Sequence, residues 1–177
     1  MASTILFLTL LHNSRFRIQI RRATAADLPA VGRLGALLVK THYDFDEKRF
    51  MSPTPQTPVG YASFLGTQLD EPDTVVFVAE EQGDVVGYSY ASVEGVDYMS
   101  LRGPAGVLHD IVVSPGHRGR GVGRLLLEET LAFLQAHGAP RVVLSTAEGN
   151  AVAQRLFAGA GFRRTMIEMT RELGPAG

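Results

Sequence analysis

The residues best suited to bind a phosphorylated ligand stand together in the run Arg-Gly-Arg-Gly-Val-Gly-Arg, which starts at position 118. Its glycines let the backbone approach a ligand closely, and its arginines supply positive charge and hydrogen-bond donors. The helix predicted to follow would add the unpaired N–H groups of its first turn and the positive end of its dipole. We therefore predict a diphosphate site formed by Arg118, Gly119, Arg120, Gly121, Val122, Gly123 and Arg124.

The spacing of this run excludes two common nucleotide-binding loops. A Walker A loop ends in Gly-Lys-Ser or Gly-Lys-Thr, whereas this run ends in Gly-Val-Gly-Arg. A dinucleotide fingerprint G-x-G-x-x-G that began at Gly119 or Gly121 would need glycine at position 124 or 126, where Arg124 and Leu126 stand. An ordinary dinucleotide-binding domain is therefore disfavoured.

Two motifs in this half of the chain resemble the GNAT family of N-acetyltransferases. The run R-x-x-G-x-G at positions 118–123 follows a predicted strand and matches the family pattern R/Q-x-x-G-x-G/A. The run N-x-x-A-x-x-L-F-x-x-x-G-F, from Asn150 to Phe162, resembles the second family motif, N-x-x-A-x-x-L/F-Y-x-x-x-G-F. The resemblance extends from about residue 17 to residue 173.

This resemblance implies an α/β fold of the α+β type. The expected sheet is mixed but mostly antiparallel, has about six or seven strands, splays between its fourth and fifth strands and is flanked by about four helices. Acetyl-CoA is the implied co-substrate and would lie in that opening, with its pantetheine arm along Ile111, Val112 and Val113. The amide of Val112 or Val113 would bind the thioester oxygen. Further contacts to the co-substrate are expected from Asn150 and Phe157.

The implied activity is acetyl transfer to a primary amine of a small molecule or protein, by direct attack in a ternary complex. Many family members use a Tyr of the second motif as general acid, but Phe157 at that position cannot donate a proton. Tyr88 or Tyr90 could substitute, water could, or the CoA thiolate could leave unassisted. For the base, His109 is the first candidate and Asp110 the second, because adjacent strand residues face opposite sides of a sheet.

A second reading of the same motifs is a non-catalytic domain that binds acyl-CoA as a sensor or regulator. Phe157 favours this alternative, because it removes the usual acid while leaving the diphosphate loop intact. Release of CoA thiol with a panel of amines would separate the two readings. No metal site is predicted, because the five His residues are scattered and show no ligand spacing.

The predicted elements that position these motifs follow from hydrophobic periodicity and from Gly and Pro breaks. The resemblance to the GNAT family also implies that the loops 40–60 and 94–106 select the acceptor. In chain order, we predict a strand (16–21), a helix (24–39), a loop (40–60), a short helix (61–69), a hairpin (74–80 and 85–91), a loop (94–106), a strand (107–113), a helix from 122, a strand (141–146), a helix (151–160) and a final strand (162–173).

Composition limits the class of protein. The chain has 177 residues with 17 Lys plus Arg against 18 Asp plus Glu, and a net charge of −1 argues against a nucleic-acid partner. We expect residues 1–15 to be a leader outside the fold and residues 16–174 to form a single domain. No apolar run is long enough to span a membrane, and the absence of Cys is compatible with a cytoplasmic location. The final strand carries apolar residues at a sheet margin, where pairing or covering is needed, and so predicts a homodimer: Met166, Ile167 and Met169.

Overall fold

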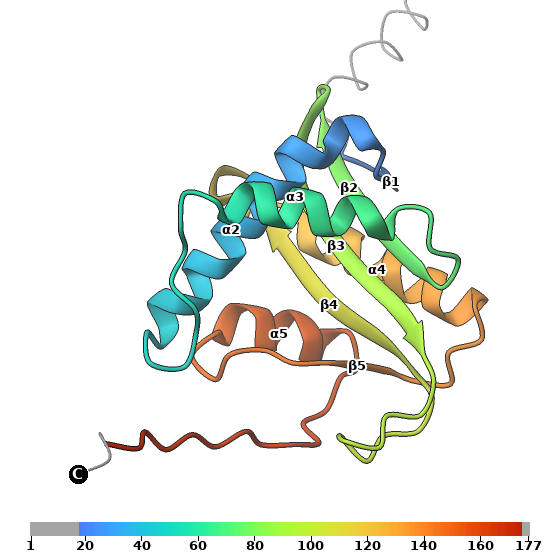
Figure 1. Ribbon diagram of the computed structural model, residues 1–177. Coiled ribbons are helices and arrows are strands. Elements are labelled where there is room, and N and C mark those ends of the chain that lie inside the picture. Colours follow the sequence, from blue (N-terminus) through green and yellow to red (C-terminus); the bar gives the residue numbers. More distant parts are fainter. Residues whose placement is uncertain (1–17, 175–177) are drawn as a thin grey trace, which may run out of the picture.

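The computed structural model describes residues 18–174, which form a five-stranded sheet in the order β1-β2-β3-β4-β5 (Figure 1). The first four strands pair antiparallel, and β5 pairs parallel with β4. The connection between β4 and β5 therefore crosses over through a helix, as a parallel pair requires. The strands are β1 (Gln19–Arg22), β2 (Thr74–Glu81), β3 (Asp84–Glu94), β4 (Ala105–Val113) and β5 (Val142–Leu144).

Helices cover both faces of the sheet. In Figure 1, α2 (Leu28–Phe45) and α3 (Thr57–Gln68) lie in front of it and α4 (Val122–Ala136) lies behind. α5 (Ala151–Gly159) follows β5, and the short 3-10 turns η1 (Ala25–Asp27) and η2 (Pro115–His117) complete the order. Among the described residues, no helix is long and apolar enough to cross a membrane.

Each face of the sheet carries its own apolar core, because alternate strand residues point to opposite sides. The α2 and α3 side buries strand residues against helix residues in the cluster Val31, Leu34, Leu65, Val76, Val78, Tyr88, Tyr90 and Val112. The α4 side buries a second cluster that includes Val75, Phe77, Ala79, Leu108, Leu126, Leu127, Leu134 and Phe157. The sheet is thus held rigidly between two packed layers.

Close packing between α2 and α3 fixes the position of the Tyr61 ring. A Cβ added at Gly35 of α2 would lie 2.2 Å from Cδ1 of Tyr61, which belongs to α3. A larger residue at position 35 would therefore push the tyrosine ring out of its place. The glycine on one helix fixes the aromatic ring on the other.

The sequence predicted the fold class correctly but not every element. The sheet has five strands rather than six or seven, because the predicted final strand, residues 162–173, forms no strand. A strand needs a neighbour to bond with, whereas this segment runs along the lower edge of the molecule in Figure 1 away from the sheet. Met166 and Ile167 are 76% and 87% exposed there.

Other boundaries differ by shorter distances. The predicted loop 40–60 is shorter in the structure, because α2 continues to Phe45 and α3 already begins at Thr57. Of the strand predicted over 16–21, residues 19–21 lie in β1. The predicted leader, residues 1–15, lies outside the described residues.

Candidate active site

An opening begins where β5 leaves β4. The two strands pair only at Gly106 with Val142, Val107 with Val143 and Leu108 with Leu144. β5 ends at that point, whereas β4 continues to Val113. The backbone groups of Ile111, Val112 and Val113 on this edge therefore have no β5 partner. Of the groups that face this edge, the Val113 carbonyl accepts from Arg118 Nε, and the others are available to an extended ligand that binds in the way an added strand would.

A β-bulge in β4 coincides with this opening. Tyr90 of β3 pairs with Asp110, and Ala91 pairs with Leu108, so His109 between them has no partner on β3. The extra residue turns His109 and Asp110 to the same side of the sheet. His109 stacks on Tyr90 with ring centroids 4.7 Å apart, and Asp110 accepts a hydrogen bond from Tyr88. The expectation that adjacent residues here face opposite sides is therefore wrong.

His109 ends a chain of hydrogen bonds along β3. Its Nε2 lies 2.7 Å from Ser92 Oγ and 3.3 Å from Glu94 Oε1, and the Ser92 hydroxyl donates to Glu94 Oε1 over 2.9 Å. Arg102 holds the same carboxylate, with its Nη2 2.6 Å from Glu94 Oε2. The tautomer that satisfies these groups carries its proton on Nε2. Nδ1 then keeps its lone pair and can accept a proton.

Burial adjusts the proton affinity of both candidate bases. It lowers the pKa of His109, while the carboxylates of Glu94 and Asp110 act in the opposite direction. It raises the pKa of Asp110, and the hydrogen bond from Tyr88 opposes that shift. His109 is thus expected to be neutral, and competent as a base, through the neutral pH range.

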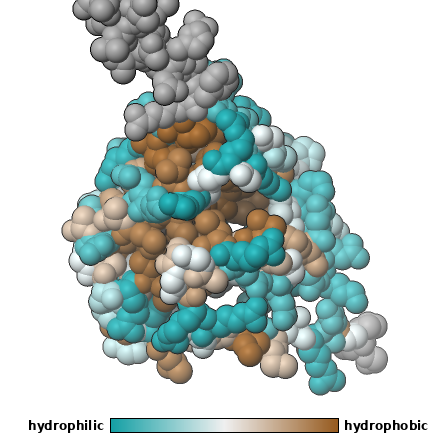
Figure 2. Space-filling model, turned by 180° about the vertical axis from the view of Figure 1, so that it is seen from behind, coloured by the Kyte–Doolittle hydropathy of each residue, from teal (hydrophilic) through white to brown (hydrophobic). Residues whose placement is uncertain are grey.

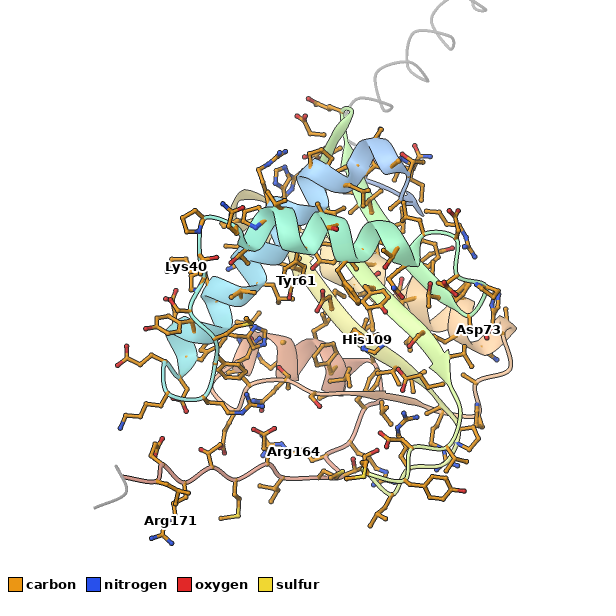
Figure 3. The ribbon with its side chains drawn as sticks, viewed as in Figure 1. Lys40, Tyr61, Asp73, His109, Arg164 and Arg171 are labelled. Carbon is orange, nitrogen blue, oxygen red and sulfur yellow. The ribbon has the colours of Figure 1, made fainter. Side chains whose placement is uncertain are left out.

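The two candidate tyrosine acids already have partners. The Tyr88 hydroxyl donates to Asp110 Oδ2 over 2.8 Å, and burial raises the pKa of Tyr88 well above its usual value. The Tyr90 hydroxyl donates to Gln68 Oε1 over 3.1 Å. A third tyrosine, Tyr61 of α3, lies on the same side of the sheet as His109 (Figure 3). Burial and the Asp110 carboxylate raise its pKa to about 12.

The predicted diphosphate loop leads directly into α4. Gly119 and Gly121 have φ of 73° and 84°, and a Cβ at either would meet open space. Gly121 is the N-cap of α4, so the first turn of the helix presents N–H groups with no intrahelical acceptor. Left-handed glycines and open surroundings fit a backbone that must approach a bulky anion.

The arginines of this loop all make contacts within the protein. Arg118 Nε donates to the Val113 carbonyl over 3.0 Å, and Arg124 pairs with Glu128 in an exposed ion pair at 2.8 Å. Arg120 binds Glu81 through two guanidinium nitrogens, at 3.0 and 2.5 Å. Arg120 therefore has a protein carboxylate as its partner.

The two second-motif residues have structural contacts. Asn150 is the N-cap of α5, and its Oδ1 accepts from the Ala153 amide over 3.1 Å. Phe157 is only 6% exposed and lies in the core on the α4 side, where its ring meets Phe162 edge-on at 5.8 Å. Capping and core packing account for these residue types.

Sequence reasoning did not predict the contacts made by Ser92, Glu94, Gln68 and Glu81. A signal for the first two was present, because Tyr88, Tyr90, Ser92 and Glu94 alternate along one strand and so share a face. No local pattern links Gln68 or Glu81 to their partners, which lie 22 and 39 positions away.

The described surface outside the candidate site holds an open groove but no cluster that could bind a metal ion. No group of three or more His, Cys, Asp or Glu there could hold a metal ion. An open groove of about 460 Å³ is lined by β1 residues with Phe77 and the second half of α4. None of the candidate catalytic residues lines this groove. Figure 2 views the molecule from behind and shows hydrophobic residues gathered over the upper and middle part of that face.

Comparisons with known proteins show relatives in sequence and in fold. A mycothiol acetyltransferase of Thermobispora bispora is 36% identical over 97 residues, which cover 52% of this chain and 31% of that protein. The chain thus spans about a third of that relative's length. A solved structure of the BH1408 protein from Bacillus halodurans has a TM-score of 0.75 at 24% identity, covering 88% of this chain and 99% of that one.

A second solved structure is that of an acetyltransferase bound to CoA. Aminoglycoside N-acetyltransferase AAC(6')-Iy in complex with CoA has a TM-score of 0.67 at 19% identity, covering 89% of this chain and 95% of that one. The model of the acetyltransferase (GNAT) family matches residues 39–162, which contain the bulge, the diphosphate loop and α5. The chain belongs to the GNAT family of acetyltransferases.

Proposed function

We propose that this protein transfers an acetyl group from acetyl-CoA to a primary amine, by direct attack of the amine on the thioester in a ternary complex. The observation that carries the proposal is the position of His109. It stands in the bulge of β4 where β5 has just left, with Nε2 held by Ser92 and Glu94. A neutral imidazole with a fixed tautomer beside an open strand edge is suited to accept a proton from an attacking amine.

The donor would bind along β4 and across the start of α4. Ile111, Val112 and Val113 would pair with the pantetheine amides, and the amide of Val112 or Val113 would stabilise negative charge on the thioester oxygen. The backbone of residues 119–124 would bind the diphosphate. The CoA complex of the aminoglycoside N-acetyltransferase, whose fold is similar, supports this proposal.

Acetyl transfer also requires a proton for the departing thiolate. Phe157 cannot supply it, and the hydroxyls of Tyr88 and Tyr90 are bonded to Asp110 and Gln68. A thiol ionises not far above neutral pH, so CoA is a tolerable leaving group without a protein acid. We therefore propose unassisted or water-assisted departure of the thiolate.

Release of CoA thiol tests this function directly. The enzyme is mixed with acetyl-CoA and each member of a panel of amines: polyamines, aminoglycosides, amino acids and peptides with free N-termini. Acetylated product that appears with a primary amine, and not with the matched N-methylated tertiary amine, is the expected result. Binding of acetyl-CoA without turnover on the whole panel would favour the alternative function, a domain that binds acyl-CoA as a sensor. Burial of Phe157 at the usual Tyr position is the observation that favours that alternative.

The homodimer is also a proposal. Met166, Ile167 and Met169 are 76%, 87% and 89% exposed on a segment that pairs with no strand of the described chain. An exposed apolar stripe of extended chain needs a covering surface, and a second copy of the chain would supply one. Light scattering is expected to give twice the monomer mass, and Ile167→Asp is expected to return the monomer. A mass near 19.1 kDa at all concentrations would contradict the dimer.

A further inference from the structure

A buried carboxylate stands beside the loop that is proposed to bind the diphosphate. Glu81 is the last residue of β2, and its side chain is only 10% exposed. It accepts from both terminal nitrogens of Arg120, at 3.0 and 2.5 Å, and lies 3.1 Å from Nε2 of His117. The other ring nitrogen of His117 lies 2.7 Å from Ser114 Oγ. A negative charge next to a polyanion site requires an explanation, because the two repel each other.

The effect of Glu81 on diphosphate binding depends on which of two roles Arg120 has. If Arg120 is a ligand of the diphosphate, then Glu81 competes with the diphosphate for the same guanidinium. If Arg120 instead ties the loop to the sheet, then Glu81 is the anchor and the diphosphate is bound by other groups.

The geometry favours the anchor. The bidentate pairing engages both terminal nitrogens of the guanidinium with the carboxylate, and withdrawal of Arg120 would leave the Glu81 carboxylate buried and short of donors. Gly119 and Gly121, which flank Arg120, both have positive φ and open surroundings. Glycine loses the most conformational freedom on ordering, so the residue between two such glycines is where an anchor fixes the loop most effectively.

The neighbouring contacts extend the same anchoring. Arg118 Nε donates to the Val113 carbonyl on one side of Arg120, and His117 connects Glu81 to Ser114 at the end of β4. The hairpin pairing of Glu81 with Asp84 places the carboxylate at the end of the β2–β3 ladder. By contrast, Arg124 is 76% exposed and pairs with the exposed Glu128, and exposed ion pairs are weak. Arg124 is therefore the arginine that can turn to a ligand at small cost.

We propose that Glu81 is a positioning residue that holds the diphosphate loop in its binding conformation through Arg120 and His117. Arg120 is then an anchor and not a phosphate ligand, and the diphosphate is bound by backbone amides of residues 119–124 with Arg124. This inference deepens the proposed function and rests on it.

Glu81→Gln tests the proposal with two independent measurements on the full chain. The first is calorimetric titration with CoA. The anchor predicts a Kd about tenfold higher than wild type, because a charge-assisted pair is lost and the loop must be ordered on binding. Competition predicts a lower Kd, because Arg120 would be released to the ligand. An unchanged or lower Kd would overturn the proposal.

The second measurement needs no ligand. Hydrogen exchange of the amides of residues 117–123 is expected to be faster in Glu81→Gln than in wild type, and unchanged exchange would overturn the anchor. If wild type does not bind CoA but exchange is faster in the variant, the proposed function fails and the anchor stands. Glu80→Gln is the matched control, because Glu80 is the neighbouring carboxylate on the same strand but binds Arg21 instead. It is expected to leave both measurements unchanged.

A double variant and steady-state kinetics exclude a general structural effect. In the double variant Glu81→Gln with Arg120→Gln, the anchor predicts a Kd no higher than that of either single variant, because both remove one interaction. Losses that add would mean that Arg120 binds the ligand itself, and would overturn the proposal. The KM for acetyl-CoA is expected to rise while kcat stays near wild type, and Glu81→Asp, which keeps the charge, is expected to recover part of the loss. A fall in kcat at unchanged KM would contradict a positioning role.

Discussion

Replacement of His109 by Ala is the most direct test of the proposed chemistry. The variant removes the only imidazole in the bulge, while Asp110 keeps its bond from Tyr88 at 2.8 Å. A positioned general base contributes about 10²- to 10⁴-fold to rate, which corresponds to about 2.7 to 5.5 kcal/mol of transition-state stabilisation. The structure places the expected loss toward the upper end, because Ser92 and Glu94 already hold Nε2 in place. Acetyl-CoA binding should change little, since the hydrogen-bond, ion-pair and ring partners of His109 are Ser92, Glu94 and Tyr90 of β3 rather than residues of the proposed diphosphate loop.

The pH dependence identifies the base. Burial lowers the pKa of His109, so kcat/KM is expected to rise with pH through an acid limb below about 6.5, the ordinary value for imidazole. Above this pH the imidazole is neutral, and its titration no longer changes kcat/KM. The amine acceptor also titrates, so kcat/KM is measured with a series of amines of different basicity. A limb that moves with the amine belongs to the substrate, and the limb that stays in place belongs to His109 and is expected to vanish in His109→Ala.

Asp110→Asn is the matched control, because it removes the neighbouring candidate base and changes the size of the side chain little. If His109→Ala keeps kcat/KM within about threefold of wild type while Asp110→Asn abolishes turnover, Asp110 is the base and the reasoning from the hydrogen-bond chain is refuted. If both variants retain activity, amines enter already neutral and neither residue accepts the proton.

Three further substitutions test other parts of the structure. Glu94→Gln is expected to lower kcat about tenfold and to move the fixed acid limb to lower pH, because the carboxylate that raises the pKa of His109 is gone; rates measured across pH check both. Gly121→Asp is expected to abolish the rise in melting temperature that acetyl-CoA gives. In wild type this rise reflects a stabilisation of about 2.7 kcal/mol at a ligand concentration one hundred times Kd, and a rise retained in the variant would contradict the proposed diphosphate loop. Asp27→Asn is expected to lower the free energy of unfolding by about 2 to 3 kcal/mol at neutral pH, because Asp27 accepts from Arg21 and Thr24. Since the pKa of Asp27 is lowered in the folded state, this contribution is present above the unfolded value of about 3.9 and is lost as pH falls below it, so the difference from wild type in urea titrations should shrink in acid.

Local sequence patterns predicted most helices and strands, because the periodicity of apolar residues is a property of each segment alone. The hairpin of β2 and β3 follows from two β-rich runs around Gly83, and α4 follows from apolar residues at helical spacing after Gly121. The prediction of a diphosphate loop is equally local, since the residue types and glycine spacing of one short run exclude the Walker A and dinucleotide loops. Residues 162–173 show the limit of this reasoning. They have the composition of a strand, but whether a strand forms depends on a neighbour that the pattern does not supply.

Long-range pairs were not predictable from the chain. The link between Glu81 and Arg120 spans 39 positions, and that between Tyr88 and Asp110 spans 22. In both cases one partner is a strand residue, Glu81 or Tyr88. Its residue type is common in strands and by itself indicates no functional role. The register of β3 and β4 brings Tyr88 close to Asp110, whereas Glu81 meets Arg120 because the loop between β4 and α4 passes the end of β2.

The bulge at His109 also explains why donor and base can share one place. Leu108 is the last residue of β4 that pairs with β5, and His109 is the residue that β3 leaves unpaired. The ladders on the two sides of β4 are therefore interrupted within one residue of each other. One interruption frees the backbone that would bind the thioester arm, and the other turns the imidazole to the side of Ser92 and Glu94. A regular β4 would separate His109 and Asp110 onto opposite faces, so the proposed activity depends on a single extra residue in this strand.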